Sequence, residues 1–189
     1  MAIGLMKPLT LLLRFSALAE RINVAVGKTV AWLTLFMVVV TCVVVVFRYA
    51  FSSGWIWMQE MVTWAHGIVF MLAAAYTLSC DEHVRVDIFY RNASPRRKAL
   101  VDLVGSLLLL LPVCLFLLWS SLDYAAASWS VTEASRQTGG LPGLFLLKSV
   151  IPLTALMLAL QGVAMAVRSI AILLGSNTHP GKPDTRKRP

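Results

Sequence analysis

Apolar residues in this chain fall into four long blocks, separated by shorter polar stretches. The blocks cover residues 29–47, 61–80, 103–122 and 149–167. A helix rises about 1.5 Å per residue, so about 20 apolar residues cross the roughly 30 Å hydrocarbon core of a bilayer. The pattern therefore predicts an all-α integral membrane protein with four transmembrane helices, in a single membrane domain over residues 1–175.

The composition supports a membrane protein and argues against a soluble domain. Hydrophobic residues make up 58% of the chain and charged residues 14%, whereas soluble domains have about 45–50% and about 25%. The net charge of +8 does not indicate nucleic-acid binding, because the charges gather at the ends of the apolar blocks. Cys42, Cys80 and Cys114 lie in or beside these blocks without a CxxC pattern, and are interpreted as small packing residues.

Cationic residues are divided unequally between the two sides of the predicted membrane domain. All but three of the 17 Lys and Arg residues lie in the N-terminal segment, the connection after the second block, or the C-terminal segment. The exceptions are Arg48, Arg136 and Lys148. Because cytoplasmic segments carry the excess of Lys and Arg, we expect both termini in the cytoplasm. Residues 176–189 are polar, Pro-rich and basic, and are expected to form a disordered cytoplasmic tail.

The N-terminal segment carries basic residues at a spacing of seven. On a helix such residues share one face with a slow drift, and apolar residues lie between them. Residues 9–26 therefore predict an amphipathic helix on the membrane surface, with an irregular leader as the alternative. Basic side chains on the cytoplasmic side are candidate anchors for the phosphates of anionic phospholipids: Lys7, Arg14, Arg21, Arg96, Arg97 and Lys98.

The connection between the third and fourth blocks is the longest on the outer side. It begins with the alanine-rich "DYAAASW", continues through Glu133 and Arg136, and reaches the helix-breaking "GGLPG". We expect a short helix on the outer surface here. A passive turn would be equally economical, and the sequence leaves both open.

Few ionisable residues lie near the apolar blocks, and these are the first functional candidates. Arg48 and Glu60 flank the short outer connection 49–59 and are predicted to pair with each other or with a partner subunit; independent snorkelling to lipid phosphate and water is the alternative. His66 is the one histidine within a predicted span. A packing role for His66 is favoured over haem ligation, which would need a second ligand. A haem- or quinone-associated anchor of an oxidoreductase, and a small proton-coupled exporter using Glu60, are the competing hypotheses.

Small residues and helix breakers favour a scaffold over an autonomous transporter. Pro112 is the expected central breaker, predicted to kink the third span, and no second half repeats it. Gln161 is predicted to form an interhelical hydrogen bond. Small residues provide faces for helix packing: Gly67, Ala73, Ala74 and Ala75 in the second span, and Ala155, Ala159, Gly162 and Ala166 in the fourth.

The charged stretch "SCDEHVRVDIFYRNASPRRK", residues 79–98, leads from the second span to the third. If the second helix continues through it, Asp81–Arg85 and Asp87–Arg91 form i,i+4 pairs in the favourable order. Ser94 is expected to cap the third helix, with Pro95 at its first position. The stretch has no metal-ligand spacing, and is interpreted as a cytoplasmic anchor between two spans.

Several motifs, in this order on four spans, resemble a known family. They are "FRYAF" (47–51), "WMQEM" (57–61), "DEHVRVDIFY" (81–90), "SPRRKALVDL", "GLPGLFLLKSVIPL" and "LQG". The chain resembles the small membrane subunit, of the DctQ type, of the tripartite ATP-independent periplasmic (TRAP) transporters. One departure is that Gln59 precedes Glu60, where many relatives have two consecutive acids; this puts in doubt any docking role of the first acid.

The resemblance implies a transport component rather than an enzyme, with no cofactor and no metal. It implies a sodium-coupled system of the bacterial inner membrane that imports organic acids. A large permease subunit (DctM type) carries the substrate and sodium sites, and a periplasmic substrate-binding protein (DctP type) delivers the substrate, so the particular acid cannot be identified from this chain. The small subunit would enlarge the scaffold and contribute to docking. Candidate interface or docking residues are Arg48, Trp57, Glu60, His83, Arg85, Asp87 and Glu133.

Overall fold

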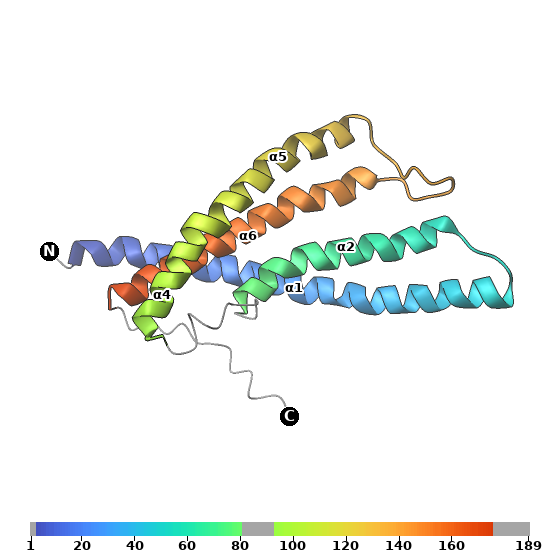
Figure 1. The fold of residues 1–189 in the computed structure, drawn as a ribbon. Helices are drawn as coiled ribbons and strands as arrows, with labels where there is room; N and C mark the ends of the chain where they lie inside the picture. The colour runs from blue at the N-terminus through green and yellow to red at the C-terminus, as the bar shows by residue number, and fades with distance from the viewer. Residues whose placement is uncertain (1–2, 81–92, 176–189) are drawn as a thin grey trace, which may run out of the picture.

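Four long helical rods make up the described part of the chain (Figure 1). The computed structural model describes residues 3–80 and 93–175, and their side chains from residue 11 onward. The helical elements are α1 (Ile3–Ala50), α2 (Ile56–Ser79), α4 (Pro95–Val104), the π-helical turn η1 (Gly105–Leu110), α5 (Leu111–Ser130) and α6 (Leu144–Leu173). Because α4, η1 and α5 follow one another without a break, they form a single rod.

The prediction of four membrane-spanning helices is confirmed. Each rod is long and apolar enough to cross a bilayer; three contain the whole predicted span, and the second covers residues 61–79 of the predicted span 61–80. The helices run farther than the apolar blocks, so the connection between α1 and α2 shortens from the expected 49–59 to 51–55. At the end of α1, the amide of Ser53 donates to the carbonyl of Phe47 at 3.1 Å. Ser52 there has a φ of 49°, the left-handed conformation that is common just after a helix.

The bundle has two distinct ends. We call the end with the connections 51–55 and 131–143 the hairpin end, and the end where α1 begins and α6 finishes the terminal end (Figure 1). An ion pair between Arg168 and Glu20, at 2.9 Å, joins α6 to α1 near the terminal end. Both ends of the described chain therefore lie on the same side of the bundle.

The N-terminal segment does not form a separate helix. Residues 9–26 are helical as predicted, but they belong to the 48-residue helix α1, which is about 72 Å long at 1.5 Å per residue. Ser16, Ala19 and Asn23 are buried on one side of this segment, and the hydroxyl of Ser16 donates to the carbonyl of Ala164 in α6. The segment continues as part of α1 because this small-residue stripe packs on α6.

Helix α6 is the centre of the bundle. It packs against α1, α2, α4, η1 and α5 (Figure 1). The small residues of its predicted packing face are buried within the chain: Ala155, Ala159, Gly162 and Ala166. At Gly162 a Cβ atom would lie 2.9 Å from Leu110 Cδ2, so the absence of a side chain lets α6 approach the third rod closely.

Pro112 and Pro152 lie in the interiors of the third and fourth rods, and only Pro112 was expected to interrupt its helix. Pro112 follows the π-helical turn η1. Its ring would crowd the carbonyl four residues earlier, and a π-turn changes the hydrogen-bond register just before it. Pro152 is also inside a helix, α6, which continues through it. Pro152 lies between the hairpin end and the middle of α6, so Pro112 is still the proline at a central position, and the kink expected there stays a prediction.

The expected short helix on the outer surface is not present. Residues 123–130 continue α5 to Ser130, and residues 131–143 form turns and bends. The amide of Glu133 donates to the carbonyl of Ser128 at 3.1 Å, and Thr132 has a φ of 43°. The alanine-rich residues at the start of this connection are helical because they extend the third rod, and they do not begin a new helix.

The cap of the third rod is as predicted. The side chain of Ser94 accepts a hydrogen bond from the amide of Arg97 at 3.4 Å, and Pro95 is at the first helical position. The predicted pairs Asp81–Arg85 and Asp87–Arg91, and the predicted tail 176–189, lie outside the described residues.

Candidate functional site

The hairpin end holds the densest set of polar contacts among the described residues. Its first centre is Glu60, a half-buried residue in the first turns of α2. The carboxylate accepts a hydrogen bond from the backbone amide of Leu141 at 2.7 Å and another from the hydroxyl of Ser135. Both donors belong to the connection 131–143, which we call the outer loop. Glu60 therefore joins the α1–α2 hairpin to the outer loop of the α5–α6 hairpin.

Gly140 allows this close approach. A Cβ atom at residue 140 would lie 2.6 Å from Ser135 Oγ and 2.7 Å from Glu60 Oε2. Ser135 also accepts a hydrogen bond from the amide of Gln137 at 3.1 Å, and its own amide donates to the carbonyl of Leu141 at 3.0 Å. Gly140 thus makes space for the Glu60 carboxylate.

Glu133 is the second centre and fixes the other side of the outer loop. Its carboxylate accepts hydrogen bonds from Lys148 of α6 and from Ser128 of α5, the latter at 2.7 Å. The hydrogen bond from Lys148, and then that from Ser128, lower the pKa of the Glu133 carboxyl from its ordinary value. The Glu133 carboxylate is therefore ionised at neutral pH, and its hydrogen bonds connect the start of the outer loop to α5 and α6.

Aromatic side chains surround the Glu133 contacts. Lys148 Nζ lies 4.3 Å from the centre of the Tyr124 ring, a cation–π contact. Trp129 donates from Nε1 to the hydroxyl of Ser149 at 2.7 Å, and its ring lies edge-on against Phe145. These contacts hold α5 against α6 at the hairpin end of the bundle.

The structure does not bring Arg48 and Glu60 together. Arg48 is exposed at the end of α1, and the described residues show no ion pair between the two. The prediction of an Arg48–Glu60 pair is wrong within this chain, because Glu60 is occupied by the outer loop; a contact of Arg48 with another subunit stays a prediction. Trp57 is 40% exposed at the start of α2, which leaves part of its ring available to a partner.

The terminal half of the bundle contains a buried polar contact between α1 and α6. Asn23 Nδ2 donates to Gln161 Oε1 at 2.8 Å, and both side chains are almost fully buried. This confirms the interhelical role predicted for Gln161. The Nε2 atom of Gln161 has no partner among the described residues. Asn23 was not identified from the sequence, although its place in a stripe with Ser16 and Ala19 is a signal for a packed polar residue.

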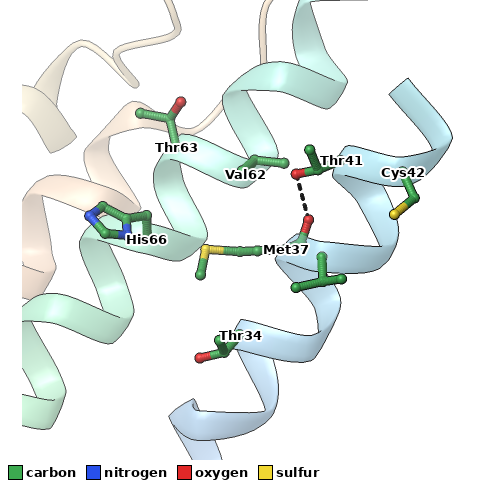
Figure 2. A pocket seen from close by; sticks show the side chains of 8 residues that line it. Thr34, Met37, Thr41, Cys42, Val62, Thr63 and His66 are labelled. Atoms are coloured by element: carbon green, nitrogen blue, oxygen red, sulfur yellow. Dashed lines mark hydrogen bonds between the residues drawn. The ribbon is translucent and has the colours of Figure 1, made fainter. Parts of the chain in front are cut away.

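His66 lies on the surface rather than in the core. It is exposed and lines a groove between α1 and α2 with a free volume of about 540 Å³ (Figure 2). His66 therefore does not pack within this chain's own bundle, and the predicted packing role, which would need a neighbouring molecule, stays a prediction. In the described part of the chain, no group of three or more His, Cys, Asp or Glu side chains could hold a metal ion.

The candidate lipid anchors have solvent-accessible side chains where these are described. Arg14, Arg21, Arg96 and Arg97 are exposed, and Lys98 is half-buried. Lys7 precedes the residues whose side chains are described, and His83, Arg85 and Asp87 fall in the gap 81–92. Contact of these residues with phospholipid stays a prediction.

By its fold, this chain is a helical membrane protein with four rods. Hydrogen bonds accepted by Glu60, Glu133 and Gln161 connect these helices and the outer loop to one another. A family model confirms the class: residues 37–172 match the DctQ component of the tripartite ATP-independent periplasmic transporters. The matched region includes parts of all four rods.

The chain therefore belongs to the DctQ family, and is a small permease subunit of a TRAP transporter. Searches among curated proteins and among solved structures give no match.

Proposed function

We propose that this chain is the scaffold subunit of a sodium-coupled importer of organic acids in the bacterial inner membrane. It would associate with a large permease subunit that carries the substrate and the sodium ions, and with a periplasmic binding protein that delivers the substrate. The family match over residues 37–172 carries the proposal, because that family is a component of binding-protein-dependent transporters.

The polar contacts of the chain support a scaffold role. Glu60 and Glu133 are both engaged by the outer loop and its flanking helices, and Gln161 accepts from Asn23. A substrate or sodium site would need polar groups directed into an accessible cavity. The groove between α1 and α2, which includes several polar side chains, carries no acidic residue.

The distribution of charge supports an orientation with the terminal end in the cytoplasm. Arg14, Arg21, Arg96, Arg97 and Arg168 lie toward that end, whereas the hairpin end has Arg48, Arg136 and Lys148 beside the acids Glu60, Asp123 and Glu133. The hairpin end would then face the periplasm, where the outer loop and Trp57 are accessible to the binding protein.

Uptake into proteoliposomes tests the coupling and the substrate class. The complete complex and its binding protein are supplied with radiolabelled dicarboxylates, keto acids, sugar acids and aromatic acids, each with an inward sodium gradient or an equal potassium gradient. We expect one class of acid to accumulate with sodium and to fail with potassium. Uptake that is independent of sodium, or that proceeds without the binding protein, would contradict the proposal.

A further inference from the structure

The groove between α1 and α2 is lined by side chains that recur at helical spacing. On α1 these include Thr34, Val38 and Thr41, and on α2 they include Thr63 and His66. Figure 2 shows Met37 extending from α1 toward α2 within the same groove. The lining has no Lys, Arg, Asp or Glu, so its shape and chemistry suit another transmembrane helix, which small residues allow to approach closely.

The hydroxyls in the groove are already satisfied where their bonds are described. Thr41 donates to the carbonyl of Met37 at 2.7 Å, and Thr63 donates to that of Gln59 at 3.2 Å. Such bonds to the preceding turn let threonine face lipid without an unpaired donor. These two residues therefore do not require a polar partner.

His66 is different, because no hydrogen bond to its ring is found among the described residues. It lies six residues after Glu60, which is about 9 Å along the helix axis. Glu60 is bonded to the outer loop, and His66 belongs to the helix Ile56–Ser79, which is apolar enough to cross a bilayer, so we expect its ring to lie below the membrane surface. Lipid tails offer no hydrogen-bond partner, and an unpaired polar group there costs several kcal/mol.

We propose that the α1–α2 groove is the seat of a transmembrane helix of the large permease subunit, and that this helix presents a polar side chain that pairs with the imidazole of His66. The inference rests on the proposed function, since it takes its partner from the transporter complex. It goes further by naming the face of the small subunit that is used and the chemistry required of the partner.

A lipid and a second copy of this chain fit the groove less well. A phospholipid tail would fill the apolar lining but leave the His66 ring unpaired. A second copy would set one groove against another, and it could offer only its own His66, since its Thr41 and Thr63 hydroxyls are engaged with their own helices. A polytopic partner supplies both an apolar ridge and a polar group, and the family places such a subunit in the same membrane.

Photolabelling of the wild-type protein locates the occupant without any substitution. A lipid-soluble diazirine is activated in nanodiscs that contain this chain alone or its complex with the large subunit, and labelled peptides are quantified by mass spectrometry. We expect residues 34–42 and 62–66 to lose label at least several-fold in the complex. The lipid-exposed α5 residues around Phe116, which is 69% exposed, serve as the reference surface and should keep their label.

Variants at His66 test the polar contact. His66→Leu should weaken association with the large subunit about threefold to tenfold, the effect of a lost interhelical hydrogen bond. His66→Gln keeps a donor and an acceptor and should stay within about twofold of wild type. Thr41→Val is the matched control, because it removes a groove hydroxyl that is bonded within its own helix.

The outcomes separate this inference from the proposed function. If the wild-type chain does not associate with the large subunit, the proposed function fails. If the complex forms but the groove keeps its label, the groove is occupied by lipid and the inference is overturned. Protection that is already present in the chain alone and rises with its density would identify a second copy instead, and also overturn it. Equal association of His66→Leu and wild type would overturn the polar contact.

Discussion

Glu60 joins two segments that are 75 or more positions apart in the sequence. Its carboxylate accepts from Ser135 and from the amide of Leu141, so one acidic residue satisfies two donors of an irregular loop. Hydrogen bonds to an ionised acceptor are stronger than neutral ones. The position of the outer loop relative to α2 therefore depends on this single side chain.

Replacement of Glu60 by alanine should release the outer loop. We expect the Leu141 amide to exchange with deuterium at least about tenfold faster, since the loss of a hydrogen bond to a charged group costs roughly 1.5–3 kcal/mol. Glu60→Gln keeps an acceptor oxygen and should have a smaller effect. Hydrogen–deuterium exchange with peptide-level mass spectrometry measures the change.

The control for this prediction is Arg48→Ala, which removes the charge first expected to pair with Glu60. Arg48 is exposed and is not bonded to Glu60 in the described structure, so exchange in the outer loop should be unchanged. Equal effects of the Arg48 and Glu60 variants would show that the loop does not depend on the Glu60 contacts.

The lowered pKa of Glu133 predicts a specific dependence of stability on pH. In the folded state the hydrogen bonds from Lys148 and Ser128 favour the ionised carboxylate. Its contribution is therefore complete above the ordinary value of 4.5, and is lost as the pH falls below that value through the lowered folded pKa. The difference in thermal unfolding midpoint between wild type and Glu133→Gln should be constant from neutral pH to about 4.5 and shrink in stronger acid. A difference that shrinks well above 4.5 would contradict the assigned contacts.

At the scale of the elements, close contacts of small residues determine how α1 lies against α2 and α6. At Gly27, a Cβ atom would lie 2.3 Å from Tyr76 Cγ and 2.4 Å from Tyr76 Cβ. These atoms are near the backbone of α2 and cannot move away by a rotamer change alone. The α1–α2 spacing therefore requires a glycine at this position.

Substitution of Gly27 by alanine should push α1 and α2 apart. We expect the free energy of unfolding in mild detergent to fall by roughly 1–3 kcal/mol, the usual cost of overpacking. Gly67→Ala is the matched control in α2, because the nearest atom to its Cβ would be Leu147 Cδ1 at 3.9 Å. That variant should be neutral or slightly stabilised. If both variants have the same stability, the close α1–α2 approach is not present in solution.

The elements could largely be predicted from the sequence, because each span is a local property of about 20 apolar residues. Ser94 and Pro95 were also identified, since a helix cap is determined by adjacent residues. The continuation of α1 into the N-terminal segment was missed: it depends on packing of Ser16, Ala19 and Asn23 against a helix more than 130 positions away. The Glu60 contacts were missed for the same reason. Nothing in the sequence around a carboxylate indicates which distant loop it will bind.

At the scale of the whole molecule, the two hairpins meet along α6 and are joined again at the hairpin end by Glu60 (Figure 1). Apart from these joints, the outer surfaces of the rods remain apolar and exposed: Trp32, Phe70, Leu108 and Phe116 are each more than two-thirds exposed. We expect such apolar surfaces to contact lipid tails or another membrane subunit. The molecule is thus one component of a larger membrane assembly, as the DctQ family implies.

Omission of one component at a time from reconstituted vesicles tests the account most directly. Binding-protein-dependent uptake is measured in proteoliposomes that contain the large subunit alone, this chain alone, or both. The account predicts no uptake with this chain alone, strongly reduced uptake with the large subunit alone, and full uptake when both are present. Uptake by this chain alone, or undiminished uptake by the large subunit without it, would contradict the scaffold role.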